Sequence, residues 1–134
     1  MNLHPEIIEF QKIKDERGNL TFFEYPGQTP FEIKRTYWIY NVPGGEFRGG
    51  HAYKSQQEII ISLSGSFEVN IFDGVVEKKY ILNKSNQGLF IPSLHWRTIV
   101  NFSTNSLALI ISDNCFDEND YIRDFEFFKT LVNV

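Results

Sequence analysis

One short stretch of the sequence and one residue beyond it combine side chains that suit proton transfer. Tyr53 follows His51 at the i+2 position, Glu58 comes shortly after, and Arg97 lies farther along the chain. Histidine titrates nearest to neutral pH, and hydroxyl and guanidinium groups donate hydrogen bonds to developing negative charge. These residues indicate acid/base chemistry on an organic molecule or simple ligand binding. A lone histidine is also compatible with a hydrogen-bonded structural role inside a barrel.

The expected backbone explains how these side chains would meet. Residues two apart in a strand point to the same face, so His51 and Tyr53 would enter one pocket. The following strand would add Glu58, and the strand that begins at Trp96 would add Arg97. Four positions from three strands would therefore converge inside a small barrel.

Most of the chain is expected to form short strands. Phe, Tyr, Ile and Val occur in short runs that Gly, Pro, Asn and Asp separate. The expected strands span residues 7–12, 19–25, 33–41, 50–54, 57–64, 66–72, 77–83, 88–91, 96–102 and 106–112. Residues 66–72 alternate between polar and apolar, which predicts one buried and one solvated face. Residues 59–61 do not alternate, which suits a strand covered on both faces.

The C-terminal part is expected to be the only helix, over residues 117–130. Asp117 and Glu118 are typical of a cap and a first helical turn. The expected apolar stripe consists of Tyr121, Ile122, Phe125 and Phe128. We expect this stripe to pack against the barrel rather than to bind a ligand.

The composition argues against several partners and locations. A formal net charge of −4 leaves no bulk basic surface for a nucleic-acid backbone. Cys115 is the only cysteine, so we expect no disulfide, no cysteine-based zinc cluster and a cytoplasmic location. Residues 1–11 lack the features of a signal peptide, and no apolar stretch approaches the roughly 18 residues of a membrane span. The length of 134 residues predicts a single domain over residues 1–134.

The spacing around His51 resembles the first cupin motif. Gly45 precedes His51 with five residues between them, Glu58 and Gly65 follow at the motif's intervals, and Tyr53 occupies the position of its second histidine. The resemblance implies a mostly β fold: a single cupin, that is, a double-stranded β-helix or jelly-roll barrel, with a short C-terminal helix. The segment 45–65 would then supply the floor of the active site.

A later stretch resembles the second cupin motif, with Pro92, Arg97 and Asn101 at its spacing and Arg97 in place of its histidine. Metal-binding cupins carry three histidines and one glutamate at these positions, a set suited to a first-row transition metal. Here Tyr53 and Arg97 break that set, because arginine cannot be deprotonated in a protein. His95 is a conceivable shifted ligand. We expect no metal and no cofactor.

Nearly the whole chain resembles the cupin sugar 3,4-ketoisomerases, also known as WxcM-like proteins, which act on TDP-linked 4-keto-6-deoxyglucose. The matching pieces are Arg17-Gly18, Ile33-Lys34-Arg35 with Tyr37, Arg48-Gly49, His51-Ala52 with Lys54, residues 63–66, Gly88-Leu89, Trp96, Phe102-Ser103 and residues 117–123. The resemblance implies a metal-free isomerase of nucleotide-sugar metabolism. Its 3-keto product would supply an aminotransferase that makes a 3-amino-3,6-dideoxyhexose for surface glycans.

The resemblance and the residue chemistry together imply roles for individual side chains. His51 is the expected base that removes the proton on C3. The other expected catalytic residues are Tyr53 and Tyr37, as partners of the C3 and C4 oxygens, and Arg48 and Arg97, as stabilisers of negative charge. The expected substrate-binding residues are Arg17 and Arg35 for the pyrophosphate, Lys54 as an alternative, Glu58 in the pocket, and Trp96 beside the sugar or base.

Two departures from the family pattern leave alternatives open. Family members with a His-x-His pair have a second pocket imidazole, whereas this chain has Tyr53, and Arg97 stands where they tend to have histidine. The alternatives are a 3,5-epimerase of a nucleotide-linked 4-keto sugar and a non-catalytic cupin that binds a nucleotide sugar. The galacto or gluco configuration at C4 of the product stays open. The resemblance also implies a homodimer, with exchange of N-terminal strands as one form of it.

Overall fold

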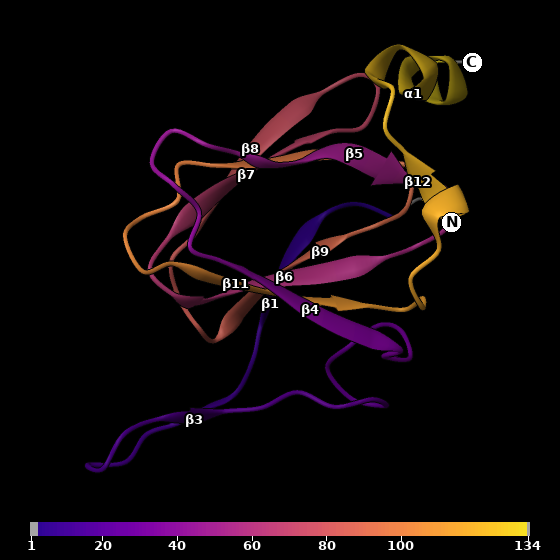
Figure 1. Cartoon of the computed structure of the whole chain (residues 1–134). Coiled ribbons are helices and arrows are strands. Elements are labelled where there is room, and N and C mark those ends of the chain that lie inside the picture. Colours follow the sequence, from indigo (N-terminus) through magenta and orange to yellow (C-terminus); the bar gives the residue numbers. More distant parts are fainter. Residues whose placement is uncertain (1–2, 134) are drawn as a thin grey trace.

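Strands with alternating apolar residues form two five-stranded antiparallel sheets that face each other (Figure 1). The structure is a computed structural model that describes residues 3–133. The first sheet has the order β1 (Glu6–Glu9), β9 (Gln87–Ile91), β6 (Glu58–Ser64), β11 (Leu107–Ser112) and β4 (Arg35–Tyr40). The second has the order β12 (Tyr121–Ile122), β5 (Arg48–Tyr53), β10 (Trp96–Val100), β7 (Phe67–Phe72) and β8 (Glu77–Leu82). This jelly-roll arrangement confirms the expected mostly β fold.

The two predicted burial patterns are confirmed. In β7, the apolar residues Phe67, Val69 and Ile71 are buried, while the residues between them are only half-buried. In β6, Ile60 belongs to the core between the sheets, whereas Ile59 and Ile61 belong to a second apolar cluster on the outer face of the first sheet. The first sheet is therefore covered on both faces, as a strand without alternation requires.

The N-terminal segment covers the outer face of the first sheet and then departs from it. Phe10 and Phe31 are buried there against Phe90, Ile59 and Ile61. Between them, β2 (Lys12–Ile13) and β3 (Leu20–Thr21) form a hairpin that projects away from the sheets (Figure 1). The strands expected over 7–12 and 19–25 are thus shorter: residues 6–9 pair with β9, and only residues 12–13 and 20–21 pair with each other in the hairpin.

The prediction of a helix over residues 117–130 is wrong for the first half of this segment. Asp117 caps only a short 3-10 turn (Glu118–Asp120), and Tyr121 and Ile122 then form β12, which pairs with β5. The helix α1 spans Phe125–Val132, and its N-cap Asp124 accepts hydrogen bonds from the amides of Glu126 and Phe127. Pairing with the open edge of β5 satisfies backbone groups that a helix over these residues would leave unpaired.

Helix α1 covers the outer face of the second sheet. Phe128 is fully buried there and contacts Phe72 and Trp96 with ring centroids 6.2 and 5.6 Å apart. Packing against the sheet is the role predicted for this part of the stripe. In the described part of the chain, no helix has the length and apolar character needed to cross a membrane.

The turn between β6 and β7 depends on a glycine. Gly65 has a φ of +70°, a left-handed conformation that favours glycine. A Cβ atom at this position would collide with the side chain of Ser103 and would lie 2.9 Å from the Cα of Ser106. The last glycine of the expected motif therefore serves a tight turn, against which the loop before β11 packs.

Candidate active site

A cavity of about 360 Å³ lies between the two sheets. The first sheet contributes Tyr37 from β4 and Glu58 from β6, and the second contributes His51 and Tyr53 from β5 and Arg97 from β10. The expected convergence of strands is therefore confirmed. The i, i+2 spacing places the imidazole and the phenol of β5 on one wall, as strand geometry requires.

A backbone irregularity in β5 sets the position of His51. Gly49 has a φ of +87°, and a Cβ atom on it would lie 2.9 Å from the Arg97 carbonyl oxygen. At the same place the pairing between β5 and β10 shifts register between Arg97 and Thr98. The bulge places Arg97 directly opposite His51 across the ladder. Glycine at position 49 thus allows the close approach of the two strands that carry the site.

The buried carboxylate of Glu58 contacts side chains from both sheets of the cavity. The hydroxyl of Tyr37 donates to Oε1 of Glu58 at 2.9 Å, and Nε2 of Gln56 donates to the same oxygen at 2.8 Å. Nη1 of Arg97 lies 3.1 Å from Oε2 of Glu58, and the two side chains are 1% and 2% exposed. Both carboxylate oxygens are therefore engaged, and Glu58 holds Tyr37 and Arg97 in place.

Arg97 is fixed from a second direction. Its Nε and Nη2 donate to the backbone carbonyl of His95 at 3.3 and 3.1 Å, and its guanidinium lies 5.1 Å from the centroid of the Tyr53 ring. A guanidinium held on both sides presents its charge to the cavity in one orientation.

Three aromatic rings, those of His51, Tyr53 and Tyr121, form the wall of the cavity on the side of the second sheet. The centroid of the His51 ring lies 4.9 Å from that of Tyr53 and 5.2 Å from that of Tyr121, and the two tyrosine centroids lie 4.7 Å apart. The hydroxyl of Tyr53 is buried and has no hydrogen-bond partner among the described residues. Burial, reinforced by the negative charge of Glu58, raises the pKa of Tyr53 and of Tyr37 far above the usual tyrosine value. Both hydroxyls therefore stay protonated and can serve as hydrogen-bond donors.

His51 is held in its neutral form. Burial lowers its pKa from 6.5 to about 3, and the positive charge of Arg97 contributes in the same direction. The near-neutral pKa expected of a base at this position is thus not found, because the sequence did not reveal how deeply the imidazole is buried. A neutral imidazole retains an unprotonated ring nitrogen, which is the form that accepts a proton.

Acid is expected to destabilise the fold through His51. The unfolded chain protonates this group near pH 6.5 and the folded chain only near pH 3, so the unfolded state binds more protons between these values. The free energy of unfolding should therefore fall as the pH falls through this window. Urea unfolding at about pH 7 and about pH 4.5 measures the change, which His51→Gln should reduce. An equal fall in both proteins would contradict the assignment.

The structure brings together all five predicted catalytic residues. Arg48 lines the cavity with His51, Tyr53, Tyr37 and Arg97, and Glu58 joins them. Arg35 lies just behind this group: its Nη2 donates to Oε1 of Gln56 at 3.3 Å, and its guanidinium lies 5.0 Å from the Tyr37 ring centroid. The roles of these residues stay predictions, whereas their proximity is a feature of the fold.

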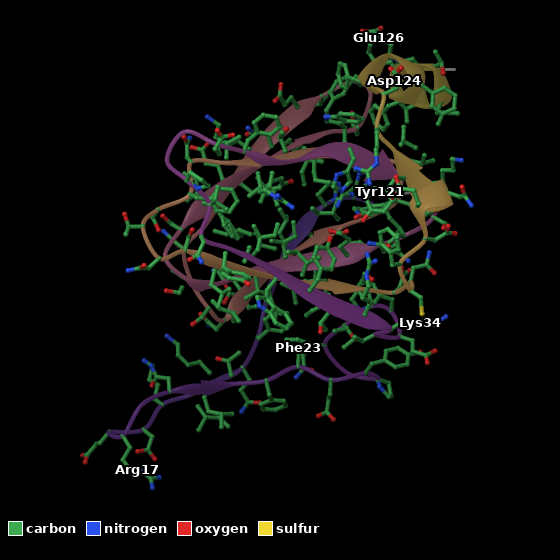
Figure 2. The ribbon with its side chains drawn as sticks, in the orientation of Figure 1. Arg17, Phe23, Lys34, Tyr121, Asp124 and Glu126 are labelled. Atoms are coloured by element: carbon green, nitrogen blue, oxygen red, sulfur yellow. The ribbon has the colours of Figure 1, made fainter. Side chains whose placement is uncertain are left out.

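Three of the predicted substrate-binding residues lie away from the cavity of their own chain. Arg17 is at the tip of the projecting hairpin, where it pairs with Asp15 at 2.8 Å (Figure 2). Lys54 is exposed at the end of β5 and is not among the residues that line the cavity. Trp96 packs on the opposite face of the second sheet, 5.1 Å from Phe125 between ring centroids.

Tyr121 and Arg123 line the cavity but were not predicted as site residues. Figure 2 shows Tyr121 beside β12, at the space between the sheets. The guanidinium of Arg123 lies 4.2 Å from the Tyr121 ring centroid and forms two hydrogen bonds with Glu118. A helical stripe was the wrong pattern for this segment. The i, i+2 spacing of Tyr121 and Arg123 is the signal of a strand that could have identified them.

The turn before β6 is anchored by a further residue that was not predicted. The carboxylate of Asp120 accepts hydrogen bonds from the amides of Ser55 and Gln56, both at 3.0 Å, and from the Ser55 hydroxyl at 2.8 Å. Gln56 in turn donates to Glu58. Asp120 thus connects the segment that carries Tyr121 to the segment that carries the buried carboxylate.

The donor set of the cavity does not suit a metal ion. Among residues 3–133, no group of three or more His, Cys, Asp or Glu side chains is placed to hold one. Glu58 is already paired with Arg97, and His95 lies outside the cavity with its Nδ1 2.8 Å from the Ser93 carbonyl oxygen. The chemistry is therefore best derived from the protein's own side chains.

Comparisons with known proteins agree on one family. The family model described as FdtA: WxcM-like, C-terminal, matches residues 3–133. The chain is 34% identical over 130 residues to the TDP-4-oxo-6-deoxy-alpha-D-glucose-3,4-oxoisomerase of Aneurinibacillus thermoaerophilus, covering 97% of this chain and 94% of that protein. A 3,4-ketoisomerase from Helicobacter canadensis is similar in structure, with a TM-score of 0.95, 38% identity, and coverage of 99% of this chain and 100% of the other.

A further similar structure contains a sugar nucleotide. It is a histidine-to-asparagine mutant of the 3,4-ketoisomerase QdtA from Thermoanaerobacterium thermosaccharolyticum in complex with TDP-4-keto-6-deoxyglucose. The TM-score is 0.96 at 32% identity, over 99% of this chain and 96% of the other. A dTDP-4-dehydrorhamnose 3,5-epimerase from Bacillus anthracis matches with a TM-score of 0.78 but only 16% identity, and that likeness concerns the fold alone.

Proposed function

Because the chain belongs to the FdtA family of WxcM-like proteins, we propose that it is a sugar 3,4-ketoisomerase that converts TDP-4-keto-6-deoxyglucose into the TDP-linked 3-keto-6-deoxyhexose. One observation carries the proposal beyond family membership: a neutral imidazole, two protonated phenols and a fixed guanidinium converge in one cavity. Moving a keto group by one carbon requires a base for a weakly acidic proton and donors for the enediolate oxygens.

The proposed reaction begins with removal of the C3 proton by His51, which leaves an enediolate with its negative charge on the C4 oxygen. The hydroxyl of Tyr53 donates to one sugar oxygen, the hydroxyl of Tyr37 turns from Glu58 to donate to the other, and Arg97 stabilises the charge. A proton then passes from the C3 oxygen to the C4 oxygen, and the imidazolium of His51 returns its proton to C4. The C3–H and O3–H bonds are replaced by C4–H and O4–H bonds, so no oxidant or reductant is consumed.

Glu58 has a positioning role in this proposal. Its two oxygens are occupied by Tyr37, Gln56 and Arg97, which leaves the carboxylate to orient its neighbours rather than to accept a substrate proton. Arg48 and Arg123 add positive charge at the cavity lining, which suits the pyrophosphate of the nucleotide, and Arg123 is held there by two hydrogen bonds to Glu118.

We also propose that the protein is a homodimer in which the β2–β3 hairpin reaches the partner subunit. The hairpin projects from the sheets and exposes apolar side chains, with Ile13 45% and Leu20 56% exposed (Figures 1 and 2). A protruding apolar hairpin is stabilised when another subunit covers it. In such a dimer Arg17, at the hairpin tip, would act on the partner rather than on its own cavity.

Replacing both Ile13 and Leu20 by serine is expected to shift the protein from dimer to monomer, because the exposed apolar surface of the hairpin would be lost. Analytical ultracentrifugation measures the change. Val75→Ser is the matched control, since Val75 is 80% exposed on the turn between β7 and β8 and should leave the dimer intact. A wild-type monomer would contradict the dimer proposal.

The proposed location is the cytoplasm, where the nucleotide sugar would be the partner and no nucleic acid or membrane would be bound. The single cysteine, Cys115, is free and exposed, which is compatible with a reducing compartment. The keto group formed at C3 would be the substrate of an aminotransferase, toward amino sugars of surface glycans.

The proposed function is tested by incubating the purified protein with TDP-4-keto-6-deoxyglucose in deuterated water and following the sugar by NMR. A new 3-keto species is the expected result. Deuterium at C5 without a 3-keto species would identify a 3,5-epimerase instead. An unchanged sugar that nevertheless binds tightly would identify a non-catalytic binding protein.

A further inference from the structure

The buried side chain of Gln56 lies directly behind the lining of the cavity. It is 2% exposed, is not among the residues that line the cavity, and donates from Nε2 to Oε1 of Glu58 at 2.8 Å. The same oxygen accepts the hydrogen bond of the Tyr37 hydroxyl at 2.9 Å. One carboxylate oxygen therefore has two donors, of which only Tyr37 lines the cavity.

We propose, on the premise of the ketoisomerase function, that Gln56 is a positioning residue that allows the Tyr37 hydroxyl to leave Glu58 for the substrate. In the proposed reaction this hydroxyl turns from Glu58 to a sugar oxygen. Oε1 of Glu58 then keeps the Gln56 amide as its donor, so the buried carboxylate oxygen is not left unpaired.

Two neighbours hold the Gln56 amide in the orientation that this role requires. Nη2 of Arg35 donates to Oε1 of Gln56 at 3.3 Å, and the backbone amide of Gln56 donates to Oδ2 of Asp120 at 3.0 Å. A guanidinium only donates and an ionised carboxylate only accepts, so the amide carbonyl must face Arg35 and the amide NH2 must face Glu58. The amide is thus a fixed donor to Glu58 whether or not Tyr37 is also bound there.

The energetic argument concerns the charged oxygen of Glu58. A buried charged acceptor that loses its last donor costs more free energy than one that loses the first of two donors. Arg97 lies against the other oxygen, Oε2, at 3.1 Å. Without the Gln56 amide, Oε1 would have no donor within the described chain once Tyr37 had turned away, and Glu58 would hold the tyrosine hydroxyl back.

Gln56→Met keeps the length of the side chain and removes its donor. The variant should have a kcat about 10- to 100-fold lower, the rate equivalent of one unsatisfied buried acceptor. Binding of TDP, measured by calorimetry, should change little because Gln56 does not line the cavity. Gln57→Met is the matched control: the Gln57 amide bonds to Asp113 at 3.2 Å, and this change should leave kcat unaltered.

The Tyr37→Phe background separates this role from a purely structural one. Phenylalanine has no hydroxyl to transfer from Glu58 to the substrate, so Gln56→Met should lower kcat no further in that background, although it should lower the stability of both proteins. Slow variants are followed by NMR of the sugar at raised protein concentration. An equal fractional loss of kcat in both backgrounds, or an unaltered kcat of Gln56→Met itself, would overturn the inference.

Gln56→Asn provides a second variant that keeps an amide but draws it back by one methylene group. It should show the same dependence on Tyr37 with a smaller loss of kcat, and circular dichroism and thermal unfolding establish that each variant is folded. Losses of kcat that are independent of Tyr37 would overturn the inference while leaving the ketoisomerase function intact. Absence of any 3-keto product from the wild-type protein would overturn the proposed function and, with it, this inference.

Discussion

His51→Asn is expected to lower kcat by about 10²- to 10⁴-fold, the usual contribution of a general base. The imidazole lies in the cavity, is neutral in the folded protein, and is the group there whose free nitrogen can accept the C3 proton. Asparagine keeps a polar side chain of similar size but cannot take up a proton at neutral pH. Turnover is measured by NMR of the sugar, and binding of TDP is measured by calorimetry.

The two readouts separate catalysis from binding. Binding of TDP should change little, because the base acts on the sugar rather than on the nucleotide. His4→Asn is the matched control, since His4 is exposed near the N-terminus and does not line the cavity. If His51→Asn kept more than about a tenth of wild-type kcat, the residue would not be the general base.

Glu58→Leu is expected to destabilise the fold by about 3–5 kcal/mol, because it leaves the buried guanidinium of Arg97 without its counter-charge. The pair is almost completely excluded from solvent, at 1% and 2% exposure of the two side chains. The variant also removes the acceptor of the Tyr37 hydroxyl. Urea unfolding monitored by fluorescence measures the change in the free energy of unfolding.

A double-mutant cycle tests the cause of this loss. Arg97→Met combined with Glu58→Leu should cost much less than the sum of the two single changes, because no buried charge is then left alone. The solvent-exposed pair of Glu126 and Lys129, 3.0 Å apart, provides the contrast, and Glu126→Gln should cost less than about 1 kcal/mol. Additive effects at positions 58 and 97 would show that the two groups stabilise the fold independently.

Much of the fold was predictable because strand periodicity is a local property. The alternation in β7 and the continuous apolar run in β6 both indicated which faces would be buried, and both predictions are confirmed. The segment around Tyr121 was assigned the wrong period, since aromatic residues at 121, 125 and 128 also fit a helix. Only the open edge of β5, which needs a partner, makes residues 121 and 122 a strand.

The alternation of side chains along a strand also explains why Trp96, predicted beside the sugar or base, lies away from the cavity of its own chain. Trp96 and Arg97 are adjacent in β10, and adjacent residues of a strand face opposite sides of the sheet. Once Arg97 enters the cavity, Trp96 must lie on the outer face, where it packs against α1. Strand geometry applied to both residues would have excluded Trp96 from the cavity of its own chain.

The sequence by itself determined the chemistry of the proposed site and the side of the strand on which each group lies: His51 beside Tyr53, with Glu58 and Arg97 on neighbouring strands. These properties follow from residue identity and from spacings of one or two residues. The tertiary structure decided which groups pair, how far burial lowers the pKa of His51, and that Arg17 lies far from its own cavity. Pairing and desolvation depend on distances between segments remote in the chain, and no local pattern specifies those distances.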